Sequence, residues 1–227
     1  MSKKPLTRDE QFLAKAAGDD VPMPKPLTRV QEFLERIVER LSGSVTEETL
    51  DNAIAPLNAS IAQLNRKTIQ FRHGKGTFTA TATGTNVVWQ YGGQKAQGSN
   101  CTFDVKSDNG LITLECDTIE NLTIQNDAEN KMDLSDLGGK ITSTLNLYNC
   151  TNITGVYSGT KYPKTVSVSK TSITSADIDA NLINFAASGV KSGTFTATGM
   201  KRTAASDDAV ATLVANGWTV SGLTKEG

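Results

Sequence analysis

A two-residue alternation occupies residues 77–83, which read Thr-Phe-Thr-Ala-Thr-Ala-Thr. Hydroxyl-bearing and apolar side chains alternate there, as they do in a β-strand with one exposed and one buried face. Strand-like runs follow at residues 87–91 and 102–106, and glycine-rich turns at residues 91–93 and 108–110 separate them from their neighbours. We therefore predict a small antiparallel β subdomain over residues 69–110.

Short strands continue beyond residue 110, each with two apolar residues that face one way. The later pairs recur at intervals of roughly 20 to 30 residues, which is the repeat length of leucine-rich-repeat-like solenoids. The pairs are Ile112 and Leu114, Leu122 and Ile124, Met132 and Leu134, Leu145 and Leu147, Val166 and Val168, Phe195 and Ala197, and Trp218 and Val220. Residues 111–227 are therefore predicted to form a leucine-rich-repeat-like β/α solenoid.

Two of the segments between these strands carry helix signals. Thr174 or Ser175 can cap a helix that ends at Gly189, and Ser206 can cap a second helix that ends at Gly217. Apolar residues recur on one face of each segment. We expect a helix in both places.

A short segment near the N-terminus occurs twice. Lys-Pro-Leu-Thr-Arg, followed by Phe-Leu, is found in residues 4–13 and again in residues 25–34. In each copy the Thr and the residue three positions later can form a capping box and start a short helix. Such helices are marginal alone, so the segment is either a poorly ordered tail or a docking peptide that folds on a partner. Duplication favours docking, because linked copies raise each other's effective concentration.

We therefore predict a duplicated helical anchoring segment over residues 1–43. Its contacts with a partner are expected from the apolar side chains of both copies, which are Leu6, Phe12, Leu13, Leu27, Phe33 and Leu34.

A different pattern follows, with apolar residues four, three, four and three positions apart. This is the alternation of d and a positions in a coiled coil. The predicted seam consists of Leu50, Ile54, Leu57, Ile61 and Leu64. Pro56 lies at an outer position, where it can kink or interrupt the helix. We predict an oligomerising helix over residues 44–68; the alternative is an amphipathic helix that packs on the chain's own β-domain.

Composition excludes several classes of protein. The chain has 23 basic and 24 acidic residues and a net charge of -1, so it lacks the basic surface expected of a nucleic-acid binder. Its apolar stretches are shorter than the roughly 20 residues that a membrane-spanning helix needs. The N-terminus has charges without the apolar core of a secretion signal. We expect neither nucleic acid nor membrane as a partner.

No catalytic, cofactor or metal site is predicted. The single histidine, His73, is expected in a surface turn, and one histidine cannot supply a catalytic pair or a multi-histidine metal site. Several aspartates could pair for sugar cleavage, but turn and strand-edge roles are favoured. They are Asp104, Asp117, Asp127, Asp133 and Asp136. We expect no enzymatic activity.

Cysteines and aromatic residues are expected to be structural. Three widely spaced cysteines make a poor disulfide framework, so Cys101, Cys116 and Cys150 are interpreted as buried thiols. Several aromatics could stack on sugars, but strand packing is favoured for them. They are Trp89, Tyr91, Tyr148, Tyr157 and Tyr162.

The C-terminal half resembles a known group of proteins. Residues 178–189, 192–199, 208–213 and 215–220 resemble the degenerate leucine-rich-repeat ends of tail and fibre proteins from phages and prophages of gut bacteria. The duplicated Pro-Leu-Thr-Arg segments resemble the leader of head-fibre proteins in similar phages. Asn is largely replaced by Thr or Ser at the repeat positions, so the resemblance implies a divergent solenoid.

The fold expected from these observations is mainly β, with N-terminal short helices and a coiled-coil-like helix before the solenoid. The resemblance implies a non-enzymatic virion protein made in the bacterial host cytoplasm, a head fibre anchored to the capsid by its N-terminus. Its β-rich domain would attach to a host surface glycan or protein. The alternatives are a tail fibre or receptor-binding protein attached to a tail protein, a bacterial repeat-domain interaction protein, and a glycan-degrading enzyme. The resemblance implies a homo-oligomer, and specifically a trimer, because phage fibres are usually three-stranded. The seam itself has Ile at its a positions and Leu at its d positions, a combination that favours two strands.

Overall fold

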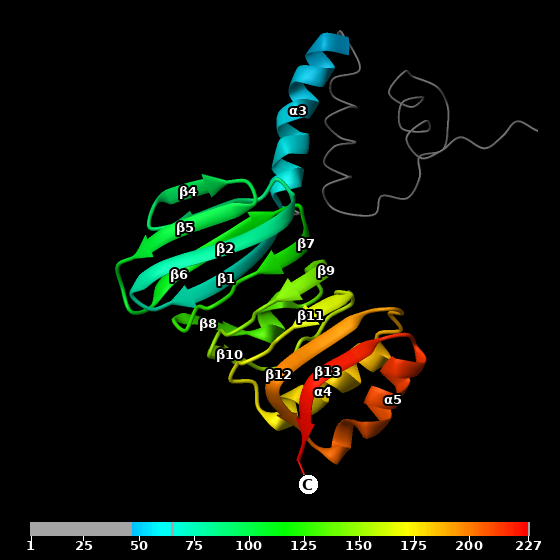
Figure 1. The fold of residues 1–227 in the computed structure, drawn as a ribbon. Helices are drawn as coiled ribbons and strands as arrows, with labels where there is room; N and C mark the ends of the chain where they lie inside the picture. Colours follow the sequence, from blue (N-terminus) through cyan, green and yellow to red (C-terminus); the bar gives the residue numbers. More distant parts are fainter. Residues whose placement is uncertain (1–46, 65, 227) are drawn as a thin grey trace, which may run out of the picture. The chain divides into compact units, whose positions relative to one another are not determined.

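The computed structural model describes residues 47–64 and 66–226. These residues belong to two compact units, the first ending at Leu64 and the second beginning at Asn65. The described part of the first unit is one helix, α3 (Glu47–Leu64). The second unit contains two β-sheets and the remaining helices (Figure 1).

The six-stranded sheet is almost entirely antiparallel. Its order is β10, β8, β1, β6, β3, β4, and only β10 and β8 run parallel to each other. The strands are β1 (Lys67–His73), β3 (Val88–Tyr91), β4 (Gln94–Gln97), β6 (Gly110–Cys116), β8 (Asn130–Asp133) and β10 (Asn152–Thr154).

The seven-stranded sheet is mixed. Its order is β13, β12, β11, β9, β7, β2, β5; the first five strands are parallel to one another, and β2 is antiparallel to both β7 and β5. The strands are β2 (Gly76–Thr85), β5 (Asn100–Val105), β7 (Thr118–Thr123), β9 (Ile141–Asn146), β11 (Thr165–Ser167), β12 (Thr194–Arg202) and β13 (Thr219–Lys225).

Aromatic side chains from the two sheets meet in the core. Phe71 on β1 and Trp89 on β3 belong to the six-stranded sheet, and Phe78 on β2 belongs to the seven-stranded sheet. The ring centroids of Phe71 and Phe78 lie 5.9 Å apart, and those of Phe78 and Trp89 lie 6.1 Å apart. All three side chains are fully buried. In this part of the unit the sheets therefore bury their apolar faces against each other.

Helices cover the remainder of the same apolar face. Helix α4 (Ser175–Ala187) and helix α5 (Asp207–Ala215) lie together against the β12 and β13 end of the seven-stranded sheet (Figure 1). Phe185 on α4 contacts Phe195 on β12, with ring centroids 5.6 Å apart. Both helices that we predicted are present, and the N-cap of α4 is Thr174, whose hydroxyl accepts a hydrogen bond from the Asp177 amide.

The predicted fold class was wrong. The described residues form a sheet-rich mixed α/β fold with two sheets and short helices, and they contain no solenoid. In a solenoid each repeat contacts only its neighbours. Here β1 pairs with β6 and β8, and β2 pairs with β5 and β7, so both sheets join strands that are distant in the sequence.

The error has a physical reason. A pair of apolar residues in a strand indicates that one face of the strand is buried, but it does not indicate which element covers that face. A second sheet covers that face in one half of the unit, and α4 and α5 cover it in the other. The segments between strands also differ, since one contains the 3-10 helix η1 (Leu134–Leu137) and others contain α4 or α5.

Candidate functional site

The predicted seam lies on helix α3. Ile54, Leu57 and Ile61 are half-buried, whereas Asn52 and Asn58 are exposed. This difference is what a helix with one apolar face produces. Leu50 and Leu64 lie within the same helix, near its two ends.

Pro56 lies inside α3 without ending it. The helix is continuous from Glu47 to Leu64 with Pro56 in its interior. Proline lacks an amide hydrogen and crowds the preceding turn, so it weakens the helix at that point. The Ser60 hydroxyl donates a hydrogen bond of 2.9 Å to the Pro56 carbonyl, one turn further along. The seam is therefore carried by one uninterrupted element.

The predicted anchoring segment lies outside the described residues. This applies to the whole of residues 1–43 and to the six apolar side chains for which we predicted partner contacts, Leu6, Phe12, Leu13, Leu27, Phe33 and Leu34.

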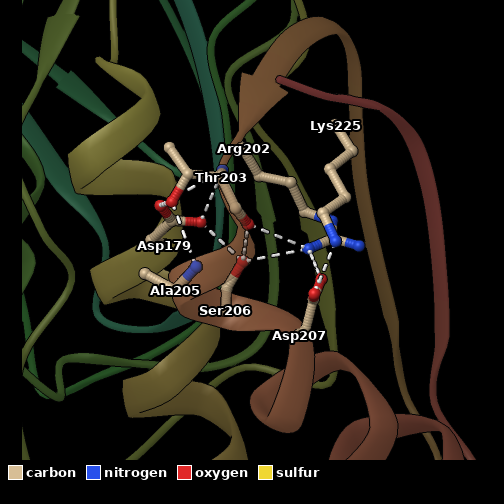
Figure 2. Close-up of polar contacts among 7 residues, drawn as sticks. All are labelled: Asp179, Arg202, Thr203, Ala205, Ser206, Asp207 and Lys225. Atoms are coloured by element: carbon tan, nitrogen blue, oxygen red, sulfur yellow. Dashed lines mark hydrogen bonds and ion pairs between the residues drawn. The ribbon is translucent and has the colours of Figure 1, made fainter. Parts of the chain in front are cut away.

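A buried carboxylate joins the two C-terminal helices. Asp179 on α4 is buried, and it accepts hydrogen bonds from Thr203 and Ser206 (Figure 2). The Thr203 amide and the Asp179 Oδ1 atom are 3.0 Å apart, the Thr203 hydroxyl is 2.6 Å from Oδ2, and the Ser206 hydroxyl is 2.5 Å from Oδ1. Thr203 is the N-cap of the 3-10 helix η2 (Ala204–Ser206), and Ser206 is its last residue and the N-cap of α5. Asp179 thus fixes the start of α5 on α4.

An ion-pair group lies beside this carboxylate. The Arg202 Nη1 atom is 2.6 Å from Asp207 Oδ1, and the Lys225 Nζ atom is 2.5 Å from Asp207 Oδ2 (Figure 2). Burial raises the pKa of Asp179, but the hydrogen bonds from Ser206 and Thr203 and the charge of Arg202 outweigh burial and leave its pKa below the ordinary value. The hydrogen bonds from Lys225 and Arg202 also lower the pKa of Asp207.

These contacts describe a structural cluster. A serine needs a base that takes its proton before it can act as a nucleophile. The carboxylate of Asp179 has a lowered pKa, so it is a poor proton acceptor for Ser206. Sequence reasoning missed the cluster because Asp179 stands beside the apolar Ile178 on a predicted amphipathic helix, and nothing in its spacing marks it as paired.

The expectation for His73 was also wrong. This side chain is buried at the end of β1, where the Nε2 atom is 3.1 Å from Asp127 Oδ1 and the Nδ1 atom is 2.5 Å from the Gly74 carbonyl oxygen. The alternation of Ile69, Phe71 and His73 along β1 was the signal that places His73 inside.

Other predicted residues have structural surroundings. Cys101, Cys116 and Cys150 are buried free thiols, as predicted. Burial raises the pKa of Cys101 to about 12 and the pKa values of the other two to about 11, so the thiols stay protonated and unreactive near neutral pH. Trp89 and Tyr157 are fully buried and so are closed to sugar stacking.

A shallow groove of about 350 Å³ opens on the outer face of the six-stranded sheet. Arg72 and Lys131, which are cross-strand partners on β1 and β8, line it together with Asp133 and Asp136. Because charges of both signs line this groove, it selects no single ligand charge.

Within residues 47–64 and 66–226, no three His, Cys, Asp or Glu side chains gather into a metal-holding group.

Comparisons with protein-family models, with curated proteins and with solved structures found no match to this chain. Among the helices that the structure describes, none is both long and apolar enough to cross a membrane.

Proposed function

We propose that this chain is a non-enzymatic structural protein of a phage particle, a head fibre that its N-terminal segment anchors to the capsid. In this proposal the α3 seam joins copies of the chain, and the two-sheet unit is displayed for attachment to a surface. The leucine-rich-repeat part of the resemblance does not support the proposal, because residues 66–226 form no solenoid. The duplicated leader and the order of segments still support it.

The observation that carries the proposal is the division of the chain at Leu64. Helix α3, with its apolar seam, belongs to a different compact unit from the strands of both sheets. A helix with a row of apolar residues is stable in water when another helix covers that row. A second copy of α3 supplies such a cover, and an anchoring segment, a helical stalk and a displayed β-unit make up a fibre.

The test uses particles purified from cells that make a tagged form of the chain. We expect the full-length protein to remain with the particles through density-gradient purification, and a form that lacks residues 1–43 to be lost from them. Gold-labelled antibody against the tag should mark the capsid. Label on the tail would replace the head assignment with a tail fibre, and a full-length chain absent from the particles would refute the proposal.

A further inference from the structure

Polar, uncharged side chains form a row across the outer face of the seven-stranded sheet. The pairing registers place one such residue of each strand next to one of the following strand. This first row runs through Asn100, Thr81, Thr123, Asn146, Ser167, Thr196 and Ser221, from β5 to β13. Residue by residue, it crosses the whole sheet.

A second row lies two residues away on the same strands. It runs through Thr83, Asn121, Thr144, Thr165, Thr194 and Thr219, from β2 to β13. The residue between the two rows points into the core on each strand, for example Leu145 on β9, Val166 on β11 and Phe195 on β12. Alternation along the strand therefore forces both rows onto the outer face.

The two rows, which we call the hydroxyl face, are open. Each of their side chains is half-buried or exposed, because α4 and α5 pack on the opposite side of the sheet through residues such as Phe195. Neighbouring strands are about 4.8 Å apart, and alternate residues of a strand are about 6.7 Å apart. The face is thus a two-dimensional lattice of small polar groups.

Most of the hydrogen-bonding capacity of this face is unused by the chain. Three side-chain bonds join neighbours within the rows: Thr81 to Asn100 at 2.9 Å, Asn121 to Thr83 at 2.6 Å, and Thr196 to Ser221 at 3.3 Å. Six other hydroxyls of the rows make no hydrogen bond to any side chain or backbone group within residues 66–226. They belong to Thr123, Thr144, Thr165, Ser167, Thr194 and Thr219. Each of these hydroxyls can both donate and accept.

The chemistry of the face selects one class of partner. Neither row contains a charged side chain, so the face lacks the Lys and Arg charges that supply most of the affinity for the phosphates of nucleic acid. Neither contains an aromatic residue, Met or Arg, the residues that concentrate in protein interfaces. A neutral chain that carries many hydroxyls matches an uncharged array of donors and acceptors.

We propose that the hydroxyl face binds a neutral polysaccharide, whose sugar hydroxyls pair with the side chains of the two rows. Each pair replaces bonds to water and so contributes little alone. Binding therefore needs many pairs, and linked copies of the chain would strengthen it further. This inference deepens the proposed role in surface attachment and rests on it, but its test uses purified protein and can fail or succeed independently of particle attachment.

The experiment measures migration of the full-length protein in native gels that contain dextran, a soluble β-1,3-glucan or yeast mannan, with heparin as the charged comparison. The test variant is Thr144→Val, Thr165→Val and Thr194→Val combined, which removes three unpaired hydroxyls and keeps the β-branched shape. The matched control, Thr68→Val, Thr113→Val and Thr154→Val combined, removes three hydroxyls from the six-stranded sheet. The rescue variant changes Thr144, Thr165 and Thr194 to Ser and so keeps the hydroxyls.

We expect at least one neutral polymer, and not heparin, to retard the unaltered protein. The test variant should raise the Kd for that polymer about tenfold or more, as the loss of three modest hydrogen bonds implies. The control and rescue variants should bind nearly as the unaltered protein does. The two Val variants should melt at nearly the temperature of the unaltered protein, since Val suits an exposed strand as well as Thr.

Four outcomes would overturn the proposal. The first is that no neutral polymer retards the unaltered protein, and the second is retardation by heparin alone. The third is a test variant that binds as well as the unaltered protein, because the threonines would then serve only to form strands. A change in oligomeric state caused by the test variant alone would also overturn it, since the face would then join copies of the chain.

Discussion

Asp179 is the residue on which the polar contacts between α4 and η2 converge. Replacement of Asp179 by Ala removes the acceptor of two donors on half-buried Thr203 and the closest acceptor of the buried Ser206 hydroxyl. Each orphaned buried group costs roughly 1–3 kcal/mol, so we expect the free energy of unfolding to fall by about 3 kcal/mol. Chemical denaturation measures this change. Asp108→Ala, at an exposed turn position, is the control and should stay within about 0.5 kcal/mol.

The same carboxylate makes stability depend on pH. The pKa of Asp179 in the folded chain lies below its ordinary value of 3.8, so the unfolded chain binds a proton first as the pH falls. Its contribution to stability is therefore complete well above pH 3.8 and is lost as the pH falls through the folded pKa. The stability difference between the unaltered protein and Asp179→Asn should narrow in that acid range. A difference that stays constant down to the folded pKa would contradict the assignment.

Trp218 has two possible roles, in the core of the unit or in contact with a receptor, and its burial favours the core. Its side chain is 3% exposed, its indole nitrogen donates a 2.7 Å hydrogen bond to the Val190 carbonyl, and its ring lies 5.7 Å from that of Phe185. Trp218→Ala should cost about 3–5 kcal/mol, the usual loss for a large buried aromatic. Trp218→Phe should cost less, because it keeps most of the packing. A melting curve for Trp218→Ala that matches the unaltered protein would refute the core role.

Single helices and strands could be predicted from local sequence signals, whereas the pairing of the strands could not. Helix α4 was predicted because its signals are local: Thr174 caps its start, and Gly189, at a φ of +71°, follows its end. The alternation in residues 77–83 likewise predicted a strand that the structure contains as β2. The strands that pair with β2 could not be predicted from the sequence, since pairing register depends on contacts with distant segments. The error in the fold class arose there, as did the missed carboxylate of Asp179.

The α3 seam gives a prediction at this scale. Changing both Ile54 and Ile61 to Asp places unpaired charges in the row that copies of α3 would bury, so the oligomer should dissociate into monomers. Light scattering coupled to size exclusion measures the mass. The control, Asn52→Asp with Asn58→Asp, adds the same charges at exposed positions and should leave the oligomer intact. An unaltered protein that already has the monomer mass of 24.2 kDa would refute the seam.

In the whole molecule, we expect folding and anchoring to depend on different parts of the chain. Deletion of residues 1–43 should leave the thermal midpoint of the two-sheet unit nearly unchanged, because the core of that unit is formed by residues after Leu64. Differential scanning calorimetry measures the midpoint. A fall of about 4 °C or more, which corresponds to roughly 1 kcal/mol or more, would mean that the leader packs on its own chain.

A cryo-electron microscopy density map of intact particles can show whether this chain is a fibre of a phage particle. The particles are purified from cells that make the chain. We expect surface density on the capsid into which the two-sheet unit of residues 66–226 fits, with a helical stalk between that unit and the shell. A map in which other proteins account for every surface feature, from particles in which mass spectrometry finds no peptide of this chain, would contradict the claim.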